Sequence, residues 1–124
     1  MPGPGFPATG EVWDASLSPT VGAEQAGVRP VVVISNDWYN ETENHLHLIV
    51  PVTGTDRGFI FHHRISGRGA GLSKNSVAMC DQVRAISPLR FLRKRGNVSV
   101  ETLAEIRRLV DLFLEDQPPY TGTP

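Results

Sequence analysis

Short apolar runs separated by polar turns fill the first two thirds of the chain. Residues 11–17 alternate apolar and polar side chains, a pattern typical of a strand with one buried face. Residues 29–35 are a β-branched run with Pro30 near its start, where a missing N–H is tolerated, and this run predicts a largely buried strand. The segment between them, residues 18–28, is expected to form a loop.

A third apolar run covers residues 46–53 and follows a polar, turn-like segment at residues 37–44. Pro51 lies inside this run and favours an edge position or a bulge, because proline cannot donate a hydrogen bond to a neighbouring strand. Beyond the turn at 54–58 and around a glycine-rich loop at 66–72, strand composition recurs at residues 59–65, 76–80 and 82–86. The short spacing between successive strands favours an antiparallel sheet over repeated strand–helix–strand units, and a small barrel is consistent with it.

The segment after residue 98 has the pattern of a helix. Ser99 can cap it, Glu101 lies in its first turn, and an apolar stripe follows at helical spacing: Leu103, Ile106, Leu109, Val110 and Phe113. We expect the helix to run to about Glu115 and to end before Pro118 and Pro119.

These elements predict a mainly β (α+β) chain with a single domain at residues 10–116, between flexible tails at 1–9 and 117–124. No apolar run approaches the ~20 residues needed to cross a bilayer, which excludes a membrane-spanning protein. The start of the chain lacks the features of a secretory signal, so we expect a cytoplasmic location. Cys80 is the only cysteine; it cannot form an intrachain disulfide, and a core position is expected for it.

Charge is distributed unevenly along the chain, although the formal net charge is only −1. Residues 1–56 carry one basic residue, Arg29, against seven acidic ones, whereas residues 57–95 carry nine basic residues against one acidic residue. Such a basic segment can contact phosphates because binding responds to the local field. A solvated surface balanced by acidic neighbours explains the counts equally well.

Four histidines are candidates for acid–base or metal chemistry. His45 and His47 share a parity, which would place them on one face of a strand, whereas His62 and His63 must point to opposite faces. This arrangement argues against a four-histidine metal site, and we expect neither a metal nor another cofactor.

The segment Glu24-Gln-Ala-Gly-Val-Arg-Pro30, followed by the apolar run, resembles the signature of the MazF/PemK toxins. Three further segments occur in the family's order: Gly10-Glu-Val-Trp13, Val50-Pro-Val-Thr53, and Gly71-Leu72 through Ser76 to Asp81-Gln-Val-Arg84. The resemblance reaches from Gly10 to the C-terminal helix.

This resemblance implies a small SH3-like antiparallel β-barrel with a C-terminal helix, of the CcdB/MazF-like kind. It also implies a metal-independent, sequence-specific endoribonuclease (an mRNA interferase) that cuts single-stranded RNA, acts as a homodimer and is neutralised by a MazE-like antitoxin. The residues that match the family's catalytic positions are Arg29 and Thr53, with Glu24 as a third candidate.

The chemistry of these residue types suits RNA cleavage by attack of the 2′-hydroxyl on the adjacent phosphorus. Arginine can stabilise the developing charge on phosphate oxygens, but its pKa of about 12.5 or more makes Arg29 a poor general base. Glu24 is a candidate base, and Thr53 can bind a nonbridging oxygen or relay a proton. Each residue also has a purely structural interpretation. Arg29 would be a strand-start arginine paired with a carboxylate, Thr53 a β-branched residue at a strand end, and Glu24 a loop carboxylate.

Residues of the basic segment are candidates for RNA binding, because flexible glycine-rich loops can follow a phosphate backbone and amide or ring groups can read unpaired bases. The candidates are Arg57, His62, His63, Arg64, Arg68, Lys74, Gln82 and Arg84. Arg90, Arg93, Lys94 and Arg95 either extend the same groove or lie solvated beside the C-terminal helix. A CcdB-like toxin that poisons DNA gyrase and a non-catalytic RNA-binding barrel are the competing functions.

Overall fold

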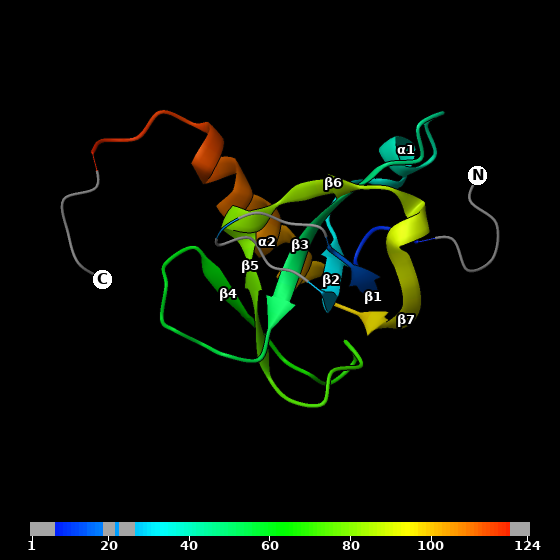
Figure 1. Ribbon diagram of the computed structural model, residues 1–124. Coiled ribbons are helices and arrows are strands. Elements are labelled where there is room, and N and C mark those ends of the chain that lie inside the picture. Colours follow the sequence, from blue (N-terminus) through cyan, green and yellow to red (C-terminus); the bar gives the residue numbers. More distant parts are fainter. Residues whose placement is uncertain (1–6, 19–21, 23–26, 120–124) are drawn as a thin grey trace.

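The computed structural model describes residues 7–18, 22 and 27–119 (Figure 1). Within these residues seven strands form an antiparallel sheet in the order β4-β5-β3-β2-β1-β7, and β6 pairs with β3 beside β5. The strands are β1 (Glu11–Ser16), β2 (Val28–Val33), β3 (His47–Thr53), β4 (His62–Ile65), β5 (Ser76–Met79), β6 (Arg84–Ile86) and β7 (Phe91–Asn97). The expected mainly β, antiparallel architecture is confirmed.

Both faces of the central strands are buried. Val32 and Val50 belong to the core beneath the C-terminal helix, whereas Val31 and Ile49 belong to a second core that includes Trp13. This burial on two sides explains why β2 is a continuous β-branched run and does not alternate with polar residues.

The C-terminal helix, α2 (Val100–Leu114), covers one face of the sheet (Figure 1). Ser99 is its N-cap, and the Ser99 hydroxyl accepts a hydrogen bond from the Thr102 amide at 3.1 Å. Leu103 and Ile106 of the expected stripe are buried, whereas Phe113 is 44% exposed. The predicted helix is confirmed, and no helix of the described residues is long and apolar enough to span a bilayer.

The two ends of the sheet, β4 and β7, do not pair with each other, so the described strands form an open sheet and not a closed barrel. The loop between β4 and β5 spans this gap and meets β7. The Asn97 amide donates to the Gly69 carbonyl at 2.9 Å, and Arg95 Nε donates to the Gly71 carbonyl at 2.9 Å. Gly71 has φ +72°, and a Cβ there would collide with the Arg95 carbonyl, so only glycine fits this contact. The glycine-rich loop is therefore packed on the sheet.

Pro51 is not at an edge, because β3 lies inside the sheet. It pairs with Val31 on one side; on the other side the pairing of β6 ends at Ile49 and that of β5 begins at Val52. A residue without an N–H is tolerated at this change of partner.

Three other expectations are corrected. The polar segment after β2 contains a one-turn helix, α1 (Asp37–Asn40), because the Asn36 side chain caps it by accepting from the Tyr39 amide at 2.9 Å. The expected strand at 59–65 is shorter, since β4 begins at His62. The seven-residue strand β7 lies where no strand was expected.

His45 and His47 do not share a face of one strand. His45 precedes β3, is exposed and has φ 52°. The His47 ring is buried, with Nδ1 2.9 Å from the His45 carbonyl oxygen and Nε2 2.9 Å from the Pro7 carbonyl oxygen, and burial lowers its pKa. Cys80 is a buried core residue as expected, and burial raises the pKa of its thiol to about 12.

Candidate RNA-cleaving site

Arg29 and Thr53 lie in the neighbouring strands β2 and β3. Arg29 is the second residue of β2, and Thr53 is the last residue of β3. Val31 and Pro51 are the last pair of this register, and Arg29 and Thr53 each lie two residues beyond it on their own strand. The two residues singled out in the sequence are thus brought together by strand pairing, and both are half-buried.

A pocket of about 240 Å³ opens beside this pair. It contains three basic residues from separate parts of the chain: Arg29 from β2, Lys74 from the loop before β5, and Arg95 from β7. The remaining lining residues are Pro30, Val52, Thr53, Gly54, Leu72, Ser73 and Ser76. We call this the site pocket. Arg29 is the single basic residue of residues 1–56, and Lys74 and Arg95 of the basic segment join it in this pocket.

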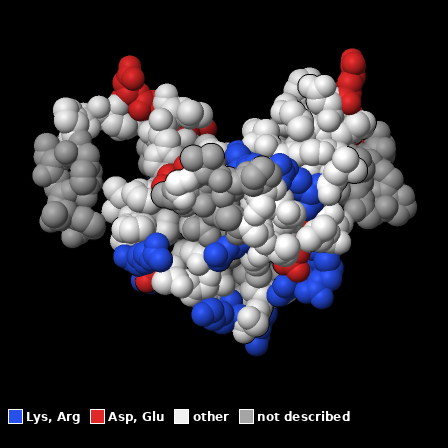
Figure 2. Space-filling model, in the orientation of Figure 1, with Lys and Arg blue, Asp and Glu red and all other residues white. Residues whose placement is uncertain are grey.

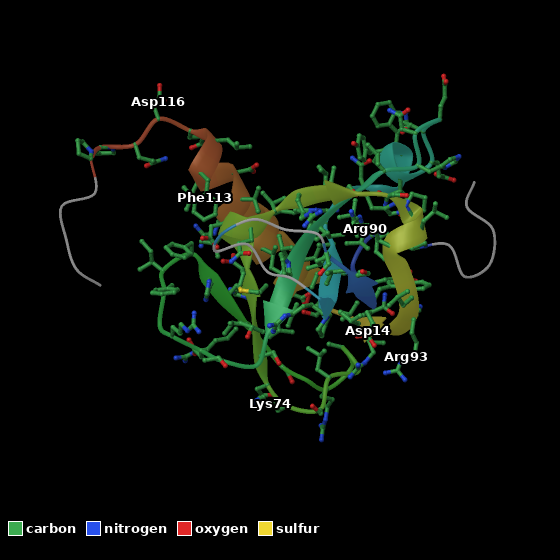
Figure 3. All side chains as sticks on the ribbon, in the orientation of Figure 1. Asp14, Lys74, Arg90, Arg93, Phe113 and Asp116 are labelled. Carbon is green, nitrogen blue, oxygen red and sulfur yellow. The ribbon has the colours of Figure 1, made fainter. Side chains whose placement is uncertain are left out.

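Lys74 reaches the site pocket across Gly54. A Cβ on Gly54 would meet the end of the Lys74 side chain, with Lys74 Nζ 2.9 Å away, so the glycine after Thr53 leaves room for this lysine. Figure 3 shows Lys74 at the end of the molecule toward which β3 runs. A flexible ammonium group in this position can follow a phosphate oxygen.

Arg95 reaches the same pocket from the opposite end of the sheet. Its Nη1 lies 3.2 Å from each carboxylate oxygen of Asp14 in β1, and its Nε donates to the Gly71 carbonyl. Its side chain is 22% exposed, which makes it a partly buried, doubly anchored cation. Asp14 was not a sequence candidate, because only the pairing of β1 with β7 brings it beside the basic run.

Arg93 and Lys94 of this run also lie on β7, whereas Arg90 lies in the turn before it and donates to the Ser16 and Ser18 carbonyls. Arg93 Nη2 is 3.4 Å from Asp14 Oδ2, and Lys94 Nζ is 2.8 Å from Glu11 Oε2. Burial raises the pKa of Glu11, but hydrogen bonds from Lys94, the Trp13 indole and the Ala8 amide outweigh it and lower the pKa overall. Figure 2 shows basic side chains over the lower part of this face and acidic ones standing out at the top.

A second pocket of about 360 Å³ adjoins the first, since Ser76 lines both. Its lining is mainly uncharged and includes Ser66 and Asn75. Arg64 and Asp56 also line it, and they form an ion pair with Arg64 Nε 2.8 Å from Asp56 Oδ2. The Gly58 amide and then Arg64 hold the pKa of the Asp56 carboxyl below its ordinary value.

The other RNA-binding candidates are placed differently. Arg57 and Arg68 are exposed on loops, and His63 is half-buried in β4. Arg84 donates to the Leu17 carbonyl at 3.2 Å, and Gln82 Nε2 lies 3.8 Å from Met79 Sδ. None of these residues is among those that line the site pocket. Glu24, the candidate base, lies outside the described residues.

His62 points into the protein. Its ring lies in T-shaped contact with Phe59 and Phe61, at centroid distances of 5.1 and 5.2 Å, and its side chain is 6% exposed. Nε2 lies 3.9 Å from Asp81 Oδ1, while Nδ1 is buried without a hydrogen-bond partner among the described residues. Burial lowers the pKa of His62, and the nearby Asp81 only partly opposes this.

Comparison with known proteins adds to this geometry. The sequence model of the family described as "PemK-like, MazF-like toxin of type II toxin-antitoxin system" matches residues 8–114. The endoribonuclease MazF9 of Mycobacterium tuberculosis is 35% identical over 111 residues, which cover 86% of this chain and 94% of that protein.

Two solved structures extend the similarity to the fold. MazF of Deinococcus radiodurans superimposes with a TM-score of 0.77 at 27% identity, over 88% of this chain and 96% of its own. A chain from a MazE-MazF complex of the same organism superimposes with a TM-score of 0.72 at 25% identity, over 88% of this chain and 96% of its own.

Proposed function

The chain belongs to the family of PemK-like, MazF-like toxins of type II toxin–antitoxin systems, and from this premise we propose that it is a metal-independent endoribonuclease that cleaves single-stranded RNA at specific sequences. The observation that carries the proposal is the site pocket, in which Arg29 and Thr53 stand together with Lys74 and Arg95. Its positive charge suits a phosphodiester, and its partly buried lining strengthens each charged contact.

RNA carries its own nucleophile. The 2′-oxygen attacks the adjacent phosphorus and loses its proton to a base, while the bond from phosphorus to the 5′-oxygen breaks and that oxygen takes up a proton. The products are a 2′,3′-cyclic phosphate and a 5′-hydroxyl. The protein must align the attack, move two protons and stabilise the extra negative charge on the nonbridging oxygens.

Arg29 is proposed to stabilise that charge, because its planar fork makes paired hydrogen bonds to phosphate oxygens. Its pairing with Ala15 of β1 fixes the backbone from which the Arg29 side chain reaches the site pocket. The Thr53 hydroxyl is proposed to donate to a nonbridging oxygen from the facing strand. Glu24 is proposed as the base, since an arginine is too basic to accept the proton.

The proposed antitoxin is a MazE-like chain, as the complex from Deinococcus radiodurans suggests by its name and its likeness in fold. An acidic segment that folds on binding would meet the same cations as RNA does. Toxin activity and antitoxin binding would then exclude each other at the site pocket. Because mRNA is the proposed target, the proposal also places the activity in the cytoplasm.

A homodimer is proposed as the acting form. Its support is a group of side chains that we call the ring cluster: Phe59, Phe61, His62 and Phe113. Phe59 and Phe61 stack at 5.2 Å, and Phe61 meets Phe113 of α2 at 6.4 Å between centroids. Phe59 and Phe113 are nevertheless 42% and 44% exposed, and a second copy of the chain would cover their outer faces.

The test is incubation of the purified chain with a long unstructured RNA in excess EDTA, beside Arg29→Ala and Arg108→Ala. Arg108 is a matched control because it is exposed on α2, where it pairs with Glu105. We expect cleavage by the wild type and by Arg108→Ala, with fragments that end in a cyclic phosphate. Loss of a preorganised donor such as Arg29 should slow cleavage by about 10²–10³-fold.

Equal cleavage by the wild type and Arg29→Ala would overturn the assignment of the site. A wild type that binds RNA without cutting it would favour the non-catalytic barrel, and one that neither binds nor cuts would favour the gyrase-poisoning alternative.

A further inference from the structure

Arg95 lies at an irregularity in the pairing of β1 with β7. Val12 pairs with Gly96 and Trp13 pairs with Lys94, so Arg95 is an extra residue on the β7 side. Such a bulge turns a side chain away from the direction that regular alternation would give it, and bulges are frequent beside active sites. Here the bulged residue lines the site pocket.

Two hydrogen-bond acceptors hold the guanidinium of Arg95 in place, and one of its nitrogens can still donate to a third acceptor. Nη1 is bonded to the Asp14 carboxylate and Nε to the Gly71 carbonyl, while Nη2 has no acceptor in the part of the chain that the structure describes. A fixed guanidinium loses little side-chain entropy when an anion binds to it.

The surroundings of Arg95 keep a net positive charge despite its contact with Asp14. Asp14 faces two arginines, Arg93 at 3.4 Å and Arg95 at 3.2 Å, so one carboxylate cannot neutralise both. Figure 3 shows Asp14 beside Arg93 at the β7 side of the sheet. Arg93 shares the same carboxylate but is 69% exposed and is not among the residues that line the site pocket.

We propose that Arg95, fixed by Asp14 and the Gly71 carbonyl, binds a second phosphate of the RNA, the one next to the phosphate held by Arg29. This inference rests on the proposed function and adds a residue to it. β1 lies between β2 and β7, strands are spaced about 4.8 Å apart, and Arg95 lies two to three residues along β1 from Ala15, which pairs with Arg29, so the backbones at Arg29 and Arg95 are roughly 12 Å apart. That separation suits two consecutive phosphates of an extended strand better than two contacts to one phosphate.

If Arg95 had only a structural role, the effects of replacing it would be different. If Arg95 only ties the loop between β4 and β5 to the sheet, its loss lowers stability and leaves the number of RNA phosphates contacted unchanged. The salt dependence of RNA affinity separates the two roles, because each phosphate contact to a single strand adds about 0.7 to the slope of log K against log salt concentration.

The experiment measures binding of a 2′-O-methyl copy of the unstructured RNA, which lacks the nucleophile, at several salt concentrations. The proteins are the wild type, Arg95→Met, Arg95→Lys and the control Arg93→Met, each checked for folding by thermal unfolding. We expect the slope to fall by about 0.7 for Arg95→Met and to stay near the wild-type value for Arg95→Lys and Arg93→Met.

An unchanged slope for Arg95→Met would overturn the inference, as would an equal fall for Arg93→Met or a wild type that does not bind. If Arg95→Met does not fold, Arg95→Lys is the deciding variant, because lysine keeps the positive charge but lacks the planar guanidinium. Its RNA affinity should then fall while the salt slope stays at the wild-type value. An unchanged RNA affinity would count against the inference. Failure of the proposed function has a separate signature, namely a wild type that binds but does not cut the unmodified RNA.

Discussion

At the scale of single residues, His62 makes stability depend on pH. Its ring is enclosed by Phe59 and Phe61, and burial lowers its pKa from the ordinary value of 6.5. The folded protein therefore favours the neutral imidazole, whereas the unfolded chain takes up a proton near the ordinary pKa. The stability that His62 contributes is present above pH 6.5 and is lost as pH falls below it.

We therefore predict that His62→Phe weakens the loss of stability between pH 7.5 and pH 5.5, because phenylalanine fills the same apolar space without binding a proton. Thermal unfolding midpoints of the two proteins at both pH values measure this. Part of the pH dependence should persist, since the buried His47 also has a lowered pKa. His63→Phe is the control from the same strand, and an equal effect there would show that burial of His62 is not the cause.

At the scale of elements, the loop between β4 and β5 has two roles. The end of the loop next to β5 places Lys74 in the site pocket, and the part before it packs on β7. Gly69 and Gly71 accept hydrogen bonds from β7, and Lys74 lines the site pocket. A change where the loop touches β7 should therefore affect both stability and the position of Lys74.

Gly71→Ala should destabilise the protein more than Gly58→Ala and slow RNA cleavage. Both glycines have φ +72°, so the left-handed backbone costs both alanines a similar ~1–2 kcal/mol. Only at Gly71 does the new methyl collide with the Arg95 carbonyl, whereas nothing lies within 4 Å of one at Gly58. Urea unfolding and initial cleavage rates measure the difference, and equal losses for the two variants would contradict it.

The strands that hold the site could be predicted because their side chains repeat a simple pattern. β2 is apolar from Pro30 to Val33, since both its faces are buried there, and α2 shows its cap and stripe. β7 could not be found in this way, because the run Arg93 to Arg95 looks solvated until Glu11 and Asp14 of β1 are known to lie beside it. The pairing of β7 with β1 joins segments about 80 residues apart in the sequence, so a local pattern does not reveal it.

The residues of the candidate site also differ in whether the sequence could indicate them. Arg29 and Thr53 came from a resemblance, and strand register then places them together. Lys74 was one of several loop cations, and only the structure separates it from Arg57 and Arg68, which do not line the site pocket. The role of Arg95 depends on a bulge, which a single sequence does not display.

At the scale of the whole molecule, the site pocket and the ring cluster lie on different elements. The first is built on β2, β3 and β7, and the second on β4, the residues before it and α2. Figure 3 shows Phe113 on α2, away from Asp14 and Arg93. Subunit association can therefore be weakened by a change that does not touch the phosphate-binding side chains.

Phe113→Glu should convert the proposed homodimer to a monomer, because it places a charge among rings that a second copy would cover. Trp38→Glu is the matched control: Trp38 is also a large exposed ring, 77% exposed, but lies on α1. Light scattering after size exclusion measures the mass of each protein. A Phe113→Glu protein with the mass of the wild type, or a wild type that is already monomeric, would contradict the proposal.

The open sheet leaves β7 as an edge strand, and exposed edges invite pairing with strands of other molecules. The loop between β4 and β5 covers the Arg95–Asn97 end of β7, and Arg93 and Lys94 charge the rest. Repulsion between like charges would oppose the stacking of two such edges. Arg93 and Lys94, which flank the residue that lines the site pocket, would thus oppose aggregation at this edge, and replacing both by apolar residues should favour it.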